Sequence, residues 1–361
     1  MTCATSTRTP WWTWTWPALA LIVLGIQEIL LPNVPLIIPE VFVLVATVFA
    51  AVYHAEVVAH RVGEPLGTLV LAVAVTIIEV ALIVSGMITG TTDTAGLARE
   101  TVFAAVMIVC NGIVGICLLA GGVRHREQGF QLQGAKAALS VIIPLTTLTL
   151  VLPNVTSTTP GPTFSPSQLA FAAIVSLILY GCFLFVQTVR HRDYFLPEAG
   201  EEESHAPPPP NRVALLSTGL LFVSLFLVVA LATVLTPAVE RGIAMVGAPN
   251  SVVGIIIAGV VLLPEGLASY RAANANRLQT SMNLALGSVL ASIGLTIPAV
   301  ASVSIFHGNP LTLGLSAKEE LLLALTLIVS LLTIGTGRTT VLQGIVHLVI
   351  FAAFLFLAVV P

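Results

Sequence analysis

The sequence predicts an all-α membrane protein of eleven transmembrane helices, and composition, run length and charge support this. Of the 361 residues, 57% are hydrophobic and only 9% are charged, which is too little polar surface for a soluble globular domain. The apolar runs extend for about 20 residues, the length that a helix needs to cross the hydrocarbon, whereas a β-barrel would show ten-residue alternation. The net charge of −3 offers no basic surface for nucleic acid. Membrane lipid is therefore the expected surroundings, and nucleic acid is not an expected partner.

Each apolar run predicts one helix. The expected spans are 17–32, 36–53, 67–90, 100–121, 135–152, 166–189, 213–236, 250–270, 279–304, 319–336 and 339–360. Four tryptophans at positions 11, 12, 14 and 16 favour an interfacial aromatic belt that leads into a retained first helix, rather than a cleaved signal peptide. Glu40 falls in the first turn of the second helix, where a negative charge is favourable.

The basic residues predict how the chain is oriented. Eleven of the 14 Lys and Arg residues fall on the side of the N-terminus: Arg8, Arg61, Arg124, Arg126, Lys136, Arg190, Arg192, Arg212, Arg271, Arg277 and Arg338. Only Arg99, Arg241 and Lys318 fall on the other side. Because cytoplasmic loops carry an excess of positive charge, we expect the N-terminus in the cytoplasm and the C-terminus outside.

One hydrophilic stretch, residues 190–212, divides the chain. It contains Glu198, Glu201, Glu202, Glu203 and four prolines at 207–210, which predicts a solvated, stiff cytoplasmic linker, with weak cation attraction or regulation as the alternatives. Residues 1–35 form an N-terminal segment with the first helix, and five spans lie in each of 36–189 and 213–361. An odd number of spans per half forces opposite orientations, which is the inverted-repeat plan of secondary transporters.

Two glutamates occupy corresponding places in these halves. Glu79 lies on the second span of the first half and Glu265 on the second span of the second half. A carboxylate at membrane depth costs a few kcal/mol, so by default it indicates an ion or proton path. The bland alternative is that each acid only hydrogen-bonds across a helix interface. On the spans that follow, Asn111 and Ser288 correspond, because each stands ten residues before a further breaker, Gly121 and Pro298 respectively.

The paired acids predict the chemistry of the site. Two facing carboxylates repel when both are ionised, so they hold either protons or one cation, and this mutual exclusion can couple the two fluxes. Ca²⁺ requires six to eight oxygens, of which the two glutamates supply up to four. The candidate further ligands are Asn111, Ser288, Thr76, Ser292 and the carbonyl oxygen of Val260, which Pro264 leaves without its helical partner.

Other polar residues receive structural interpretations or a role beside the site. His54, Glu56 and His60 cluster at the cytoplasmic end of the second helix, where interfacial packing competes with an entrance or proton-relay role. His347 is expected to be a satisfied buried histidine, and Asn283 an interhelical hydrogen-bonder. Cys3, Cys110, Cys117 and Cys182 show neither metal spacing nor a disulfide pattern, so we expect small packing residues.

At these residues the chain resembles the cation/proton exchanger branch of the calcium/cation antiporter superfamily, most closely its bacterial ChaA-type calcium/proton antiporters. The matching stretches are His54-Ala55-Glu56, Gly63 to Glu79, Asn111-Gly112, Leu263 to Gly266, Asn274 to Ser288 and Gly337 to Gly344. The resemblance implies eleven helices, alternating access between two inverted five-helix repeats, an acidic stretch joining them, and one essential acid per repeat, at Glu79 and Glu265. It also implies the bacterial inner membrane.

The expected function is exchange of cytoplasmic Ca²⁺ for external protons, with no cofactor and no enzymatic activity. Where the better known calcium exchangers of the family have a Gly-Asn-Ala-Thr-Glu type of motif, this chain has Val75 to Glu79 and Leu262 to Glu265, which lack the amide. Na⁺/H⁺ or K⁺/H⁺ exchange on the same scaffold is therefore the alternative, and an ion channel the next. An intramembrane aspartyl protease is excluded because the only aspartates, Asp93 and Asp193, lie in loops.

Overall fold

The computed structural model describes residues 9–30, 36–63, 66–89, 95–196, 208–246, 249, 251–308 and 311–360. Within these ranges the regular structure is helical apart from two strands of two residues each. Eleven long helical segments correspond one to one with the eleven expected spans. Eight of the described segments are long and apolar enough to cross a membrane: Ile37–Val62, Leu97–His125, Leu132–Asn154, Pro166–Arg190, Asn211–Ala238, Ser251–Asn274, Leu278–His307 and Val341–Val359. The protein is therefore an all-helical membrane protein.

The chain folds as two compact units, each made of two stretches of sequence. Unit 1 comprises Met1–Thr94 and Glu203–Gly247, and unit 2 comprises Ala95–Glu202 and Ala248–Pro361. This division by contact differs from the division of the sequence into halves, because unit 1 takes helices from both sides of the central linker. Glu79 belongs to unit 1 and Glu265 to unit 2, and each unit is described by itself.

Unit 1 is a set of helices packed around α2. Its elements are α1 (Trp12–Gly25) with the π-helix η1 (Ile26–Leu30), α2 (Ile37–Val62), α3 (Leu66–Thr89) and α8 (Asn211–Val246). Helix α2 contacts α1, α3 and α8, and α8 also contacts α3 and α1. At the end of α2 the Arg61 guanidinium donates a hydrogen bond to the Asn211 side chain, so the last turn of α2 meets the first turn of α8.

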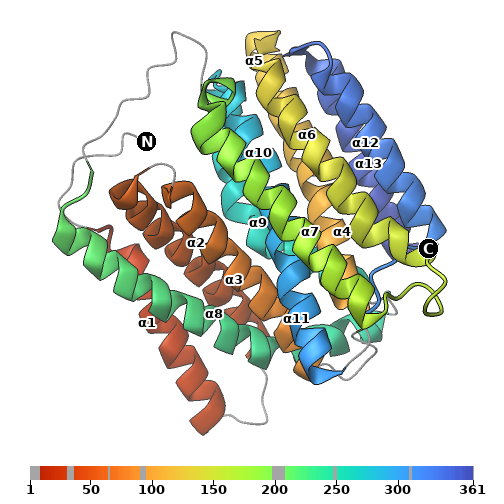
Figure 1. Cartoon of the computed structure of the whole chain (residues 1–361). Coiled ribbons are helices and arrows are strands. Elements are labelled where there is room, and N and C mark those ends of the chain that lie inside the picture. The colour runs from red at the N-terminus through yellow and green to blue at the C-terminus, as the bar shows by residue number, and fades with distance from the viewer. Residues whose placement is uncertain are drawn as a thin grey trace. The chain divides into compact units, whose positions relative to one another are not determined.

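Unit 2 contains the other helices and both strands. Its elements are α4 (Leu97–Met107), η2 (Ile108–Ile113), α5 (Val114–His125), β1 (Gln128–Gly129), α6 (Leu132–Thr146), η3 (Thr147–Val151), η4 (Leu152–Asn154), α7 (Pro166–Phe185), η5 (Val186–Arg190), η6 (Arg192–Phe195), α9 (Ser251–Asn274), α10 (Leu278–Ala291), η7 (Ser292–Thr296), α11 (Ile297–His307), α12 (Ala317–Ile334), β2 (Arg338–Thr339) and α13 (Val341–Val359). Several of these follow one another without a break, so that α4–η2–α5 and α10–η7–α11 are two continuous rods (Figure 1).

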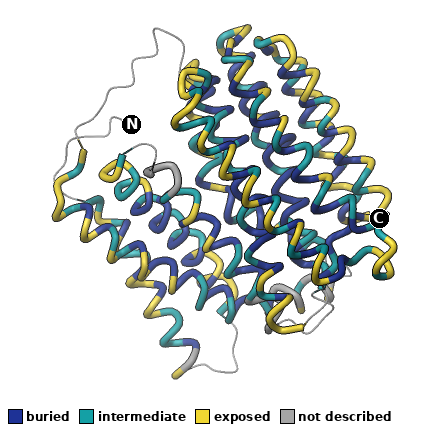
Figure 2. The backbone as a smooth tube through the Cα atoms, viewed as in Figure 1, coloured by how far each residue is buried: buried dark blue, intermediate teal, exposed yellow. Residues whose placement is uncertain are grey.

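Burial follows the two environments expected of a membrane protein. Large apolar side chains are exposed along one side of α7, α8, α12 and α13, among them Phe171, Phe226, Leu332 and Phe356. The buried residues concentrate between the helices of each unit, as the dark blue stretches in Figure 2 show. Exposed side chains of this size and number would aggregate in water, whereas in a bilayer they face hydrocarbon.

Small residues let two helices of unit 2 approach closely. A Cβ on Gly344 of α13 would lie only 2.5 Å from the Leu119 nitrogen of α5 and 2.9 Å from the Gly115 oxygen. Close approach of backbones through small residues is the usual way in which membrane helices associate, because burial from lipid gains little. This contact brings the first turn of α13 against α5 in the rod α4–η2–α5.

Several expected bounds were wrong, each for a local reason. Helix α1 begins at Trp12, so most of the tryptophan cluster lies inside the helix instead of leading into it. Helix α2 continues nine residues past position 53, through His54 and His60, and ends where Gly63 takes a positive φ of 77°. Helix α8 passes through Pro237 and ends at Val246.

The cysteine and linker predictions are tested only in part. Cys110 and Cys117 are buried and free, as expected of packing residues, whereas Cys182 is exposed on α7 and the packing prediction for it was wrong. Cys3, the acidic residues of the linker at 198 and 201–203, and Pro207 lie outside the described residues.

Candidate functional site

Glu79 sits on the buried part of α3 in unit 1. It lies 13 residues after Leu66 in a helix of 24 residues, and its side chain is only 2% exposed. Thr76, one turn earlier, is also buried, and its hydroxyl donates to the Ala72 carbonyl at 2.8 Å. Because that hydroxyl proton is used within the helix, the Thr76 oxygen keeps lone pairs that could bind a cation.

Glu265 holds the matching place on α9 in unit 2. It lies 14 residues after Ser251, again in a helix of 24 residues, and it is partly buried. The helix continues through Pro264 and past Arg271 to Asn274, so Glu265 is about 13 Å from its end by rise alone. A Cβ on the neighbouring Gly266 would touch Ile113 at 3.1 Å, which shows that α9 packs on η2 at this depth.

Asn111 belongs to a buried network that involves three helices of unit 2. Its Nδ2 lies 2.9 Å from the Thr326 Oγ1 of α12, and its Oδ1 lies 3.1 Å from His347 Nδ1 of α13. The other ring nitrogen, His347 Nε2, lies 3.0 Å from Thr333 Oγ1. The Thr326 hydroxyl donates to the Leu322 carbonyl at 2.7 Å, so it accepts from Asn111 and fixes the orientation of the amide.

This network changes the interpretation of Asn111. Because its oxygen accepts a hydrogen bond from the His347 Nδ1–H and its amide nitrogen donates one to Thr326, both ends of the side chain are hydrogen-bonded in the structure described here. The sequence predicts Asn111 as a cation ligand, and this stays a prediction; in the structure described here its hydrogen bonds join η2 to α12 and α13. His347, 1% exposed with both ring nitrogens bonded, is the satisfied buried histidine that the sequence predicts.

The remaining predicted ligands all lie in unit 2. Ser292 is buried at the first residue of η7, Ser288 is partly buried on α10, and Val260 is partly buried four residues before Pro264. Counted from the first residue of each rod, Asn111 and Ser292 both stand 14 residues in, and both lie in a π-helical segment. By depth, therefore, Asn111 corresponds to Ser292 rather than to Ser288. Such segments interrupt the regular hydrogen bonds of a helix, often at functional sites.

The three residues proposed for a cation entrance or proton relay do not form one cluster. His54 is fully buried on α2, whereas Glu56 and His60 are exposed on the same helix. Residues two apart on a helix point in different directions, while residues four apart share a face, so Glu56 and His60 are neighbours and His54 is not. The His54 Nε2 lies 3.1 Å from the Thr13 carbonyl oxygen of α1.

Pro17 explains this last contact. In a regular α1 the Thr13 carbonyl would accept the N–H of residue 17, but a proline has none. The His54 Nε2–H donates to the carbonyl instead, since a carbonyl oxygen only accepts. The neutral ring consequently presents Nδ1 as its bare nitrogen.

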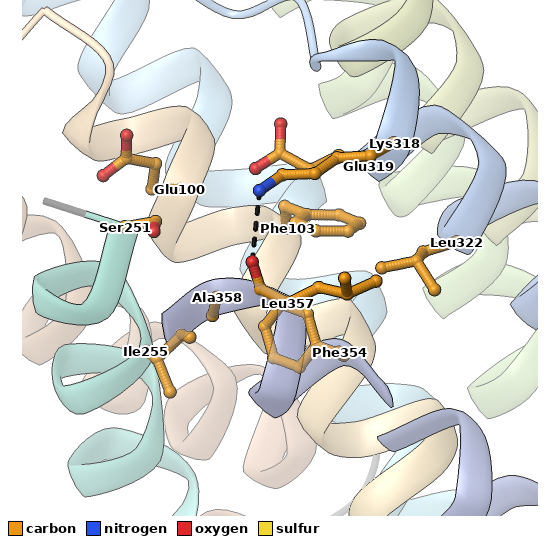
Figure 3. Close-up of a pocket in the computed structure, with 10 residues that line it drawn as sticks. All are labelled: Glu100, Phe103, Ser251, Ile255, Lys318, Glu319, Leu322, Phe354, Leu357 and Ala358. Carbon is orange, nitrogen blue, oxygen red and sulfur yellow. Dashed lines mark hydrogen bonds between the residues drawn. The ribbon is translucent and has the colours of Figure 1, made fainter. Parts of the chain in front are cut away.

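A separate pocket lies at the end of unit 2 where α4, α9 and α12 begin and α13 ends. Its lining includes Glu100, Ser251, Lys318, Glu319 and Phe354 (Figure 3). The Lys318 Nζ donates to the Leu357 carbonyl at 3.1 Å, and Glu319 caps α12 by accepting from the Ser316 nitrogen and hydroxyl. Ser251 is about 21 Å along α9 from Glu265, so this pocket is distinct from the acid.

At the opposite end of unit 2, polar residues fasten the loops together. Strand β1 pairs with β2, and the Gln128 side chain donates to the Ala273 carbonyl and the Asn276 side chain, both at 2.9 Å. Gln279 donates to Asn283 at 3.0 Å, and Asn283 donates to the Phe195 carbonyl at 2.6 Å. The stretches around 274–283 and 337–340, which carried part of the resemblance, therefore hold the ends of helices rather than line the acids. Asn283 bonds to another element, as predicted.

Comparison with known families identifies the chain. The family described as "Sodium/calcium exchanger protein" matches residues 34–189 and 216–360. The chain belongs to this family. Within the calcium/cation antiporter superfamily it is a member of the cation/proton exchanger branch of ChaA type, and it is a transporter rather than an enzyme.

Relatives of this exchanger cover almost its whole length. It is 49% identical to the y4hA protein of Sinorhizobium fredii, over 99% of this chain and 98% of that protein. It is 36% identical to the sodium-potassium/proton antiporter ChaA of Escherichia coli, over 94% and 93%. A Ca²⁺/H⁺ antiporter of Aphanothece halophytica is 24% identical, over 85% and 86%.

Solved structures share the fold of this exchanger. The native YfkE structure superposes with a TM-score of 0.73 and 17% identity, over 97% of this chain and 100% of that chain. The crystal structure of the H⁺/Ca²⁺ exchanger CAX superposes with a TM-score of 0.71 and 14% identity, over 95% and 87%.

Proposed function

We propose that this chain is a secondary transporter that exchanges a cytoplasmic cation for external protons by alternating access. The observation that carries the proposal is the pair of equal helices α3 and α9, each 24 residues long, each with one acidic residue at nearly the same depth from its first residue. Burying a carboxylate in a membrane costs free energy, and a helix with only a structural role gains nothing from it. Two such groups in corresponding places can hold protons or a cation in turn.

The proposed architecture is two inverted five-helix repeats, 36–189 and 213–361, preceded by a first helix in 1–35 and joined by the linker 190–212. That one family description matches both 34–189 and 216–360 supports this division. The equal depth of Glu79 and Glu265 supports a pseudo-two-fold relation between α3 and α9. The distribution of Lys and Arg supports a cytoplasmic N-terminus, an external C-terminus and, with bacterial relatives, the inner membrane.

For the cation we propose Ca²⁺, bound by Glu79 and Glu265 with oxygens from Thr76, Ser292, Ser288 and the Val260 carbonyl. Carboxylates, hydroxyls and carbonyls are the hard ligands that Ca²⁺ prefers. The family description and the named Ca²⁺/H⁺ antiporter among the relatives support this ion.

Na⁺ or K⁺ is the second candidate, and one observation favours it. The Asn111 oxygen already accepts a hydrogen bond from His347 and its nitrogen donates to Thr326, so this side chain has one remaining lone pair to offer a cation in the structure described here. Ca²⁺ requires six to eight oxygen ligands. A site with two carboxylates and few further oxygens therefore suits a monovalent cation that is carried together with protons better than it suits Ca²⁺. The 36% identical relative is named a sodium-potassium/proton antiporter.

Dequenching of a pH dye in everted vesicles tests both proposals. The full chain is expressed in a bacterial strain without its own cation/proton antiporters, the vesicles are acidified, and Ca²⁺, Na⁺ and K⁺ are added separately. We expect one of them to release protons, and the ion that does so at the lowest concentration is the substrate. Vesicles with the Glu79→Gln chain are the matched control. Steady proton leak without any added cation, or no response to all three ions, contradicts the proposal.

A further inference from the structure

Polar residues form a stripe on the buried face of α2 in unit 1. Glu40, Thr47 and His54 are spaced by seven residues, which places them on one side of the helix, and they are 1%, 0% and 0% exposed. The next residue of the series, Arg61, is bonded to Asn211 at the start of α8. The Thr47 hydroxyl donates to the Val43 carbonyl at 2.7 Å, whereas a buried glutamate and a buried histidine are expensive in a membrane helix, so the stripe needs a reason.

The partner helix α8 carries a second set of buried polar groups. Ser217 and Ser224, also seven residues apart, are fully buried, and their hydroxyls have no hydrogen-bond partner among the described residues. A serine in a helix can donate to the carbonyl four residues earlier, and these two do not; they are the two hydroxyls of this kind among the described residues of unit 1, whereas Ser269, Ser281 and Thr296 are such hydroxyls in unit 2. Each of these hydroxyls therefore keeps a free donor and free lone pairs, which a water molecule or a proton in transit can use.

These groups lie at matching depths. Counted from the Arg61–Asn211 contact, His54 and Ser217 are seven and six residues in, about 10 Å, and Thr47 and Ser224 are 14 and 13 residues in, about 20 Å. Helix α3 starts at the same end of α2 and packs against both α2 and α8. Glu79, 13 residues along α3, is therefore at the depth of Thr47 and Ser224.

His54 has the form of a proton-accepting group. Its Nε2–H is fixed to the Thr13 carbonyl that Pro17 leaves free, and Nδ1 has no hydrogen-bond partner among the described residues. When Nδ1 takes up a proton the ring becomes a cation, and when it releases the proton the ring returns to its neutral Nε2–H form. Neither step breaks the bond to Thr13, so the ring does not need to move.

Few ionisable groups surround this histidine. On α2 itself these are Glu40, Tyr53, Glu56, His60 and Arg61, with the Tyr53 ring 5.5 Å from that of His54. Among the described side chains of the helices packed against α2, α1 has none, α3 has Glu79, and α8 has the exposed Arg212 and Arg241. Glu79 on α3 is thus the buried carboxylate on a neighbouring helix that can exchange a proton with the polar residues of α2.

We propose that the polar stripe of α2 and α8 is the proton path of unit 1, in which His54 binds the proton in transit between Glu79 and the Arg61–Asn211 end. Hydroxyls of Ser217, Thr47 and Ser224, with water between them, bridge the steps of about 10 Å. The path rests on the proposed function, because a transporter that moves no protons has no use for it. Under the proposed orientation this end faces the cytoplasm, so external protons leave Glu79 through His54.

The test compares two fluxes in proteoliposomes of the full chain. Cation-driven proton movement requires the path, whereas exchange of labelled for unlabelled cation at equal pH on both sides requires only the cation site. His54→Gln keeps a donor for the Thr13 carbonyl but has no nitrogen that accepts a proton. We expect it to slow proton-coupled flux by about tenfold or more, as loss of a positioned proton carrier does, and to leave cation/cation exchange within about twofold.

Two further variants separate a path from a structural role. His347→Gln is the matched control, because His347 is equally buried but has both nitrogens bonded, and we expect no selective loss of proton-coupled flux. The double variant Ser217→Ala and Ser224→Ala removes two hydroxyls that have no hydrogen-bond partner among the described residues, so it should fold. We expect it to lose proton-coupled flux and to keep cation/cation exchange, as His54→Gln does.

Two outcomes would contradict the proposed proton path. One is an equal loss of proton-coupled flux and of cation/cation exchange in His54→Gln; the other is unchanged proton-coupled flux in either the His54 variant or the double serine variant. Failure of the proposed function is distinct, since the unmodified chain would then move no protons in response to any cation.

Discussion

Two buried histidines, one in each unit, show how the same side chain can be used in opposite ways. His347 in unit 2 has both ring nitrogens bonded, to Asn111 and Thr333, and it fastens α13 to η2 and α12. His54 in unit 1 has one nitrogen bonded to the Thr13 carbonyl, and its other nitrogen has no hydrogen-bond partner among the described residues. Burial alone therefore does not indicate function. The number of unused donors and acceptors separates a structural histidine from a chemical one.

The difference extends to the acids of the two units. Both Glu79 and Glu265 stand on 24-residue helices, but α3 packs against the helices that carry the polar stripe, whereas α9 packs against η2 and its satisfied network. We infer that unit 1 handles protons between the site and the cytoplasm and that unit 2 supplies a rigid frame for its acid.

The largest expected effect is loss of exchange when either acid is neutralised. Glu79→Gln and Glu265→Gln each remove one of the two carboxylates that we propose as cation ligands, so cation-driven dequenching should fall to the level of vesicles without the protein. If only one of the two variants lost exchange, the units would not contribute equal halves of the site. Glu319→Gln, an acid that caps α12 at the helix start, is the control and should retain exchange.

A smaller effect is expected where the frame of unit 2 is most tightly packed. Gly344→Ala places a Cβ 2.5 Å from the Leu119 nitrogen, which forces α13 away from α5 and should cost about 1–3 kcal/mol. Gly287→Ala is the matched control, since nothing lies within 4 Å of its Cβ, and it should be neutral or stabilising by up to about 1 kcal/mol. Thermal unfolding in detergent measures both. Equal midpoints for the two variants would show that α13 is not tightly held.

Breaking the hydrogen-bond network of His347 in unit 2 should lower the stability of the protein and leave the coupling between proton flux and cation flux unchanged. Thr333→Val keeps the shape of the side chain but leaves the His347 Nε2 without its donor, at a cost of about 1–3 kcal/mol. Thr147→Val is a control, because the exposed Thr147 hydroxyl bonds only to the Ile143 carbonyl of its own helix. The ratio of proton-coupled flux to cation/cation exchange should equal that of the unmodified chain. A changed ratio would mean that His347 also carries protons.

The smallest effect is expected at Pro17. Pro17→Ala restores an N–H that competes with His54 for the Thr13 carbonyl, so one hydrogen bond replaces another and stability should change by about 1 kcal/mol or less. The His54 ring then loses its fixed orientation, and proton-coupled flux should fall by less than it does in His54→Gln. A loss larger than that of His54→Gln would assign Pro17 a role in shaping α1 instead.

Much of the fold was predictable because the bilayer restricts the choices. The helical class and the eleven helical segments of the described residues, eight of them long and apolar enough to cross a membrane, follow from run length, since a chain in lipid must satisfy its backbone within helices. The ends were less predictable: α2 continues past His54 to Val62 because a buried, bonded histidine does not end a helix, although its polarity predicted an end at position 53.

The sequence predicts the two acids of the candidate site, which stay a proposal, but it does not show which of the other predicted ligands are already hydrogen-bonded. Asn111 has the right chemistry for a ligand, and only the positions of His347, 236 residues away, and Thr326 showed that its amide is engaged. The stripe of Glu40, Thr47 and His54 did carry a signal in its seven-residue spacing. Glu56 and His60 are closer to His54 in sequence, and grouping the three by charge obscures that spacing.

The sequence by itself determined that this protein lies in a membrane as helices and that one acid occupies the second span of each half, because hydropathy and spacing are properties of the linear chain. The tertiary structure decided which buried polar groups are hydrogen-bonded and which have no partner, since their partners lie on helices distant in sequence. Pro17 can free a carbonyl from sequence alone, but only the packing of α1 on α2 gives that carbonyl to His54 and leaves Nδ1 to a proton.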